Sequence, residues 1–146
     1  MKRFLEFATV FWIGGVLYSM VEILWRGYTH WTMTLTGGVC FVVLYGLHVY
    51  AVRVSFFVRC FLGALAITLL EFAAGCIVNL WLRWEVWDYS DVPFNILGQV
   101  CPLFSFLWLL LVAAAAPICH RLAGRISGEI PRKNSRRYCN GDGNGI

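Results

Sequence analysis

Two glutamates, Glu22 and Glu71, stand out within the long apolar stretches of this 146-residue sequence, and they are the first candidates for chemistry. Glu71 and Asn79 belong to a polar stripe that also contains Thr68 and Gly75, at steps of three and four residues, so on a helix they share one face. A charge inside a membrane costs about 2.5 to 3.5 kcal/mol on insertion scales unless it faces protein or water. We therefore expect Glu71 to be a proton or cation site in a polar cavity.

Two further polar edges accompany this stripe. Glu22 precedes Arg26 by four residues, a spacing at which the two side chains can pair on one helix face. Asn95 and Gln99 are also four residues apart, at the expected outer end of the last helix. All of these edges point to the same half of the membrane, which predicts one outward-facing site.

A dense polar and aromatic segment, residues 84–95, separates the last two apolar stretches. Its sequence is Trp-Glu-Val-Trp-Asp-Tyr-Ser-Asp-Val-Pro-Phe-Asn. Its aromatic residues could rest at headgroup depth as a membrane aromatic belt, or some could cap a pocket. We expect this segment to form the rim of the site. The ligand-binding residues predicted from all these segments are Glu22, Arg26, Glu71, Asn79, Trp87, Asp88, Tyr89, Asn95 and Gln99.

The alternative to a site is that the polar residues hold helices together, as polar side chains do within membranes. The six cysteines and the histidines show no metal-ligand spacing, so no metal site and no cofactor are predicted. No nucleophile elbow, dinucleotide fingerprint or phosphate-binding P-loop is present. Hence no catalytic residue is assigned, and an enzyme is the less favoured class.

Four apolar stretches must position these residues, near 4–25, 33–52, 61–82 and 96–117. Each has the roughly 20 residues with which a helix crosses a bilayer, in a chain that is 60% hydrophobic with a mean hydropathy of +0.69. The predicted fold is all-α: residues 1–126 form a bundle of four transmembrane helices. Residues 127–146 are expected to be a basic, disordered cytoplasmic tail.

The basic residues indicate the orientation. If both termini lie in the cytoplasm, ten of the twelve basic residues fall inside, and only Arg26 and Arg83 lie outside. We thus predict a multi-pass protein of the cell membrane with cytoplasmic N- and C-termini. The net charge of +4 then reflects topology and contact with anionic membrane lipids, and no nucleic-acid partner is expected.

The polar segment and its surroundings resemble a known family. The residues that carry the resemblance are Glu71, Gly75, Asn79, the run Trp87-Asp88-Tyr89-Ser90, Pro93, Asn95, Gly98, Gln99 and Trp108. They are similar to those of the small bacterial membrane proteins grouped as putative type IV ABC transporters. The resemblance implies a permease-like role and, because the chain carries no ATPase motif, a partner ATPase, a homo-oligomer or both.

The sequence therefore predicts a transport-associated, permease-like membrane subunit with an outward-facing polar site. Two other classes stay open. One is a membrane-embedded enzyme that uses Glu71 or Asp88 as acid or base on a lipid or isoprenoid, and the other is a purely structural membrane subunit.

Overall fold

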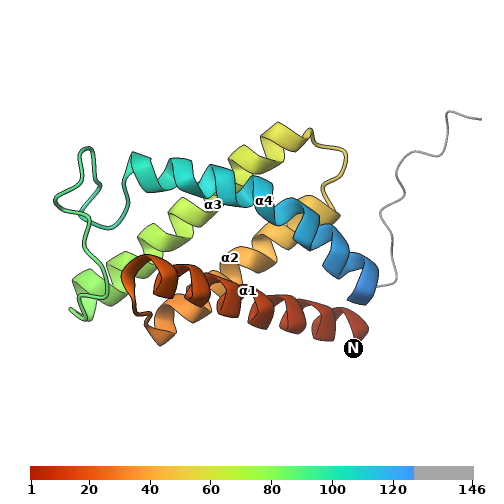
Figure 1. Ribbon diagram of the computed structural model, residues 1–146, viewed down its shortest axis with the longest axis horizontal. Coiled ribbons are helices and arrows are strands. Elements are labelled where there is room, and N and C mark those ends of the chain that lie inside the picture. Colours follow the sequence, from red (N-terminus) through yellow and green to blue (C-terminus); the bar gives the residue numbers. More distant parts are fainter. Residues whose placement is uncertain (127–146) are drawn as a thin grey trace, which may run out of the picture.

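The computed structural model describes residues 1–126, which form four long helices joined by loops (Figure 1). The elements are α1 (Lys2–Arg26), α2 (Trp31–Val49), α3 (Phe56–Gly75), its π-helical continuation η1 (Cys76–Trp81) and α4 (Pro102–Ile126). Four helices, with α3 and η1 counted as one, are long and apolar enough to cross a membrane. The predicted all-α membrane fold is thus confirmed, while the predicted tail, 127–146, lies outside the described residues.

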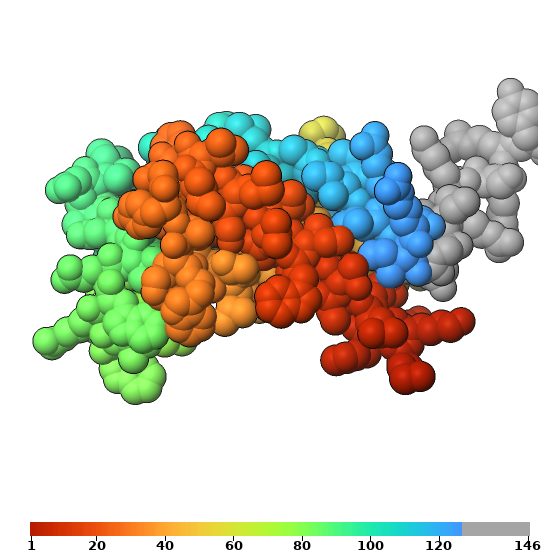
Figure 2. Space-filling model, turned by 60° about the horizontal axis from the view of Figure 1, so that its bottom comes forward, coloured from red at the N-terminus to blue at the C-terminus, as the bar shows by residue number. Residues whose placement is uncertain are grey.

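The bundle has two different ends. The loop end carries the α1–α2 turn and the long loop 82–101, while the terminal end carries the start of α1, the α2–α3 turn and the end of α4 (Figure 1). Helix α2 packs against all three other helices, and α3 packs against α4. In Figure 2 helix α1, in red, forms the near face and α4, in cyan to blue, runs along it.

Helices α1 and α2 approach closely because glycines lie where they meet. A Cβ atom at Gly14 would collide with the side chain of Phe41, and one at Gly37 would collide with Tyr18. Small residues allow this kind of backbone approach between membrane helices. Because Gly37 has no side chain, the Tyr18 side chain can pass over it and reach Glu71 on α3.

The fourth helix differs from its predicted span. It begins at Pro102 and not near residue 96, because proline lacks an N–H and its fixed φ suits the first turn of a helix. Residues 96–101 form a tight turn in which Ile96 and Val100 make an antiparallel bridge around Gly98, whose φ is +68°. Asn95 and Gln99 are therefore on a loop and not on a helical turn. The helix also continues through Pro117 to Ile126, as membrane helices can.

The second and third helices begin earlier than expected, and each is capped. The His30 ring accepts a hydrogen bond from the Thr32 amide, and the Ser55 hydroxyl accepts one from the Val58 amide. Side-chain acceptors of this kind satisfy amides that have no partner within the helix. The third span then ends in a π-helix, in which the Leu82 amide donates to the Ile77 carbonyl five residues back.

Candidate functional site

Glu71 is the centre of the polar interior. Its carboxylate accepts a hydrogen bond of 2.6 Å from the Tyr18 hydroxyl and one of 2.7 Å from the Trp108 indole N–H. The Tyr18 and Trp108 rings are themselves stacked, with centroids 5.7 Å apart. Because the three residues come from α3, α1 and α4, one buried carboxylate links three helices. Charge-assisted hydrogen bonds to a buried acid are stronger than neutral ones.

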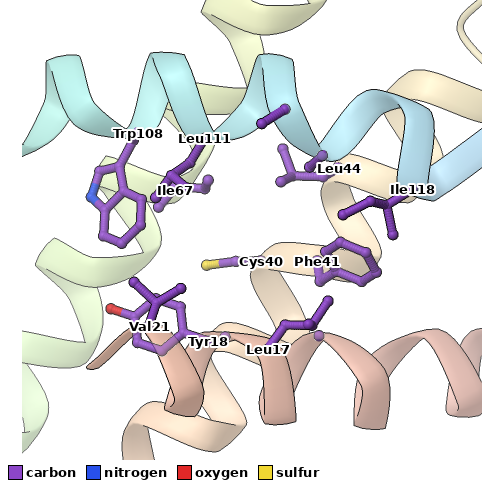
Figure 3. A pocket seen from close by; sticks show the side chains of 14 residues that line it. Leu17, Tyr18, Val21, Cys40, Phe41, Leu44, Ile67, Trp108, Leu111 and Ile118 are labelled. Carbon is purple, nitrogen blue, oxygen red and sulfur yellow. The ribbon is translucent and has the colours of Figure 1, made fainter. Parts of the chain in front are cut away.

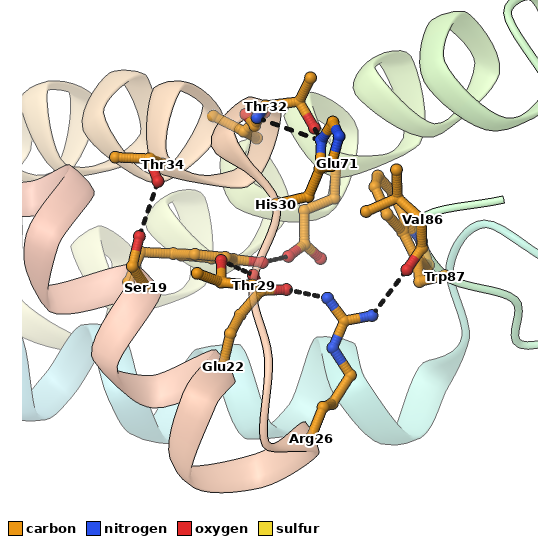
Figure 4. A network of polar contacts seen from close by, with 12 residues as sticks. Ser19, Glu22, Arg26, Thr29, His30, Thr32, Thr34, Glu71, Val86 and Trp87 are labelled. Atoms are coloured by element: carbon orange, nitrogen blue, oxygen red, sulfur yellow. Dashed lines mark hydrogen bonds and ion pairs between the residues drawn. The ribbon is translucent and has the colours of Figure 1, made fainter. Parts of the chain in front are cut away.

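The predicted pair of Glu22 and Arg26 is present as an ion pair with an N–O distance of 2.5 Å (Figure 4). The second oxygen of Glu22 accepts a hydrogen bond from the Thr29 hydroxyl, and Arg26 donates a 2.9 Å bond to the carbonyl of Val86. Arg26 also lies over the Tyr28 ring, 4.9 Å from its centroid. The pair thus ties the end of α1 to the long loop as well as to itself.

Asn79 fastens the long loop to η1. Its amide nitrogen donates to the Trp87 carbonyl at 2.9 Å and to the Gln99 side-chain oxygen at 2.7 Å, and its oxygen accepts from the Val86 amide at 2.8 Å. The Trp87 indole donates to the Gln99 carbonyl. Gly75 leaves room for this arrangement, since a Cβ there would meet Gln99 and Trp87. We call Gly75, Asn79, Val86, Trp87 and Gln99 the loop lock.

Asp88 and Asn95 lie in the outer turn of the same loop. Asp88 is exposed and accepts hydrogen bonds from the amide and hydroxyl of Ser90, which hold the pKa of its carboxyl below the ordinary value. Asn95 donates to the Ser90 carbonyl and accepts from the Gly98 amide. Within the described chain both side chains shape the turn, and neither contacts Glu71.

Tyr89 points from this loop back to the helices. Its ring stacks on Phe104 of α4 with centroids 4.5 Å apart. Burial, reinforced by the negative charge of Glu71, raises the pKa of Tyr89 well above its ordinary value. The phenol therefore stays protonated at neutral pH and can donate a hydrogen bond.

Two cavities lie between α1 and α4. The first, of about 560 Å³, is bordered by the polar groups of Tyr18, Glu22, Arg26, Tyr89 and Trp108 and otherwise by apolar side chains. The second, of about 210 Å³, is apolar and shares Tyr18 and Trp108 with the first (Figure 3). Figure 3 shows α1 and α4 on opposite sides of this second cavity, with the α2 residues Cys40 and Phe41 behind it. We call the two together the groove.

The structure places the nine predicted residues in three groups. Those bordering the groove are Glu22, Arg26 and Tyr89, with Glu71 directly behind Tyr18 and Trp108; those in the loop lock are Asn79, Trp87 and Gln99; those in the outer turn are Asp88 and Asn95.

Tyr18 is the residue that sequence reasoning missed. An aromatic residue within an apolar stretch is usually a packing residue. Its spacing carried a signal, since Tyr18, Glu22 and Arg26 follow one another at steps of four on a single helix face.

Comparison with known proteins gives one match. Residues 4–139 match the family described as "Putative ABC-transporter type IV". No curated protein and no solved structure matches the chain.

Proposed function

We propose, since the chain belongs to this ABC-transporter family of membrane proteins, that it is a permease-like subunit with an outward-facing polar site at its loop end. Both termini lie in the cytoplasm in this proposal, as the distribution of basic residues favours. The sequence contains no P-loop, so ATP is hydrolysed by a partner chain that meets the subunit on the cytoplasmic side. A second copy of the chain completes the permease if one bundle is too small.

The groove carries this proposal. Its wall is apolar along most of its length, and it carries the Glu22–Arg26 ion pair and the Tyr89 phenol at the loop end. Such a wall suits an amphiphile with an apolar tail and a small polar head. The tail would lie between α1 and α4, and the head would exchange hydrogen bonds with Glu22, Arg26 or Tyr89.

Glu71 supplies the coupling group in this proposal. Its carboxylate is separated from the groove only by the stacked rings of Tyr18 and Trp108, which both donate to it. A substrate that moves either ring changes the hydrogen bonds of Glu71 and with them its affinity for a proton or a cation. Ionisable residues inside membranes commonly serve such roles.

The test uses a strain that lacks the chain. Wild type, Glu71→Gln and Ala114→Trp are expressed in it, and lipids and metabolites of cells and medium are compared by mass spectrometry. Ala114 lines both cavities, so a tryptophan there fills the groove. Leu69→Trp is the matched control because Leu69 is 59% exposed on the outer face of α3.

We expect at least one amphiphile to be redistributed between cells and medium by wild type and by Leu69→Trp, and not by the other two variants. Membrane abundance and melting temperature of each purified variant separate loss of transport from loss of folding. Equal redistribution by folded Ala114→Trp and Glu71→Gln would contradict the site. The absence of any compound that depends on the chain would contradict a transport role.

A further inference from the structure

The buried polar atoms that lack a hydrogen-bond partner are concentrated at one place. Among residues 1–126, the side-chain atoms of this kind are both ring nitrogens of His48, Nε of Arg59 and Nδ1 of His120. They come from α2, α3 and α4, at the terminal end of the bundle, and their residues do not line the groove. Leaving a buried polar group without a partner costs about 1 to 3 kcal/mol, so a cluster of four such atoms requires an explanation.

The three side chains adjoin one another. The His48 ring is fully buried, with 0% exposure, and its centroid is 6.4 Å from that of His120. A guanidinium nitrogen of Arg59 donates a 3.1 Å hydrogen bond to the His48 carbonyl, which holds the guanidinium beside the last turn of α2. The Val112 carbonyl of α4 lies near enough to the His48 ring to interact with it, but outside hydrogen-bond geometry. We call His48, Arg59 and His120 the basic cluster.

We infer that the basic cluster binds a phosphate group. Each of its members can donate N–H hydrogen bonds, and arginine is the residue best suited to phosphate oxygens. A tetrahedral anion accepts several such bonds at once, so one phosphate can accept an N–H hydrogen bond from each of the three helices.

The charges at this end favour an anion over a metal ion. Exposed Arg53 and Arg121 lie at the same end. The one acid among the described residues there is Glu6, and it already accepts hydrogen bonds from Tyr45 and Tyr50. No group of three or more His, Cys, Asp and Glu side chains within the described chain could hold a metal ion. A guanidinium beside the two histidines would also repel a cation.

The phosphate can belong to an anionic lipid headgroup or to a small soluble compound. The basic cluster is close to one membrane surface, where the phosphates of lipid headgroups lie. The two sources share the same recognition chemistry, so the experiment separates them.

The protein is purified in an uncharged detergent without phosphate or sulfate, and its melting temperature is followed during two titrations. One titrates inorganic phosphate against chloride of equal ionic strength. The other titrates phosphatidylglycerol against phosphatidylcholine. The variants are Arg59→Gln and His48→Phe, and the control is Arg125→Gln, which removes an exposed arginine from the same end.

We expect wild type and Arg125→Gln to be stabilised with the same half-saturating concentration. Arg59→Gln should need at least about ten times more ligand, because the loss of one hydrogen bond from a charged group weakens binding by about tenfold or more. His48→Phe should lose the stabilisation. Stabilisation by phosphatidylglycerol alone identifies a lipid headgroup, and stabilisation by inorganic phosphate identifies a soluble phosphate compound. If neither ligand stabilises wild type, or if all folded variants respond alike, the inference is wrong.

Discussion

The two ends of the bundle differ in how completely their buried polar groups are paired. At the loop end, the donors and acceptors of Asn79 and Gln99 are matched to one another and to the backbone of the loop. At the terminal end, both ring nitrogens of His48, Nε of Arg59 and Nδ1 of His120 are left without partners. A fully paired network of hydrogen bonds holds one conformation, whereas unpaired donors and acceptors remain free to bind a ligand.

The paired end also holds a strained backbone. Arg83, Glu85, Phe94 and Leu97 have positive φ values between 49° and 59°, a region that residues with a Cβ rarely occupy. Such conformations persist only where the surroundings compensate for them. The bonds of Val86 to Asn79 and Arg26 hold the segment next to Glu85, and the bonds of Asn95 to Ser90 and Gly98 hold the turn that contains Phe94 and Leu97. Polarity at the loop end is therefore used first for structure, and in the proposed function the groove beside it is left for the ligand.

The largest expected effect distinguishes the two ends by their side of the membrane. Asp91→Cys and Arg53→Cys are made in a background with the native cysteines replaced, since both residues are exposed, at the loop end and the terminal end respectively. A membrane-impermeant thiol reagent added to intact cells should label Asp91→Cys and leave Arg53→Cys unlabelled until lysis. The reverse pattern would invert the proposed orientation.

Asn79→Leu should cause the largest loss of stability. It removes three buried hydrogen bonds and leaves the Val86 amide and the Gln99 side chain without their partner, at a cost of about 3 kcal/mol. Chemical unfolding in detergent measures the change. Asn95→Ala is the control and should cost about 1 kcal/mol, because water can reach the outer turn. Equal losses would show that Asn79 does not fasten the loop.

Gly75→Ala should destabilise by about 1 to 3 kcal/mol, as overpacking does. The new methyl group would press on Gln99 and on the Trp87 ring, 3.0 Å away. Gly124→Ala on α4 is the matched variant, because a Cβ there meets nothing within 4 Å. That variant should instead be neutral or stabilised by about 0.5 to 1 kcal/mol. If the melting temperatures of Gly75→Ala and Gly124→Ala fell by the same amount, the close contact of Gly75 with Gln99 and Trp87 would not contribute to stability.

His48→Phe should have the opposite sign from Asn79→Leu. Without ligand it removes two unpaired buried nitrogens and keeps a ring of similar shape, so the free energy of unfolding should rise by about 1 kcal/mol. The measurement is unfolding in detergent free of phosphate and anionic lipid. A loss of stability there would mean that His48 has a partner within the protein, and the contrast between the two ends would disappear.

The smallest effect concerns Asp88. Because its folded pKa lies below the ordinary 3.8, its contribution to stability is present above that pH and is lost as the pH falls through the lowered value. Asp88→Asn should slightly reduce the loss of stability at acid pH and leave the melting temperature at pH 7 nearly unchanged. The measurement is the melting temperature of Asp88→Asn and of wild type between about pH 2 and pH 6, a range that covers the titration of an aspartate. A large loss at pH 7 would give Asp88 a role beyond its turn.

The sequence contains enough to predict the helices and one ion pair. Four apolar stretches predict four spans, and a spacing of four residues predicts the bond between Glu22 and Arg26. Residues 96–101 were expected to be helical because Ile96, Leu97 and Val100 continue an apolar run. An apolar run does not distinguish a membrane helix from a turn that packs on the bundle, and here Pro102 decides the boundary.

The interior of the site depends on contacts between distant parts of the chain. The Tyr18 hydroxyl and the Trp108 indole meet Glu71 across 53 and 37 residues of sequence. No local pattern encodes those distances, and the roles of the partners became visible only when three helices were placed together. Asp88 shows the reverse case. It looked like a ligand contact because it is an acid next to aromatic residues, yet its two hydrogen bonds are to Ser90, two residues away.

The π-helix η1 determines which residues must accompany the loop 82–101 if that loop is transferred to another protein. Each residue turns an α-helix by about 100°, and η1 takes up an additional residue within Cys76–Trp81 before the chain leaves the bundle. If the same residues ran as a regular α-helix, the exit of the loop would turn by about that angle, which would carry Trp87 away from Asn79. The transferable unit is therefore residues 75–101. A chimera that exchanges the loop without η1 would separate Trp87 and Gln99 from Asn79, to which they are bonded.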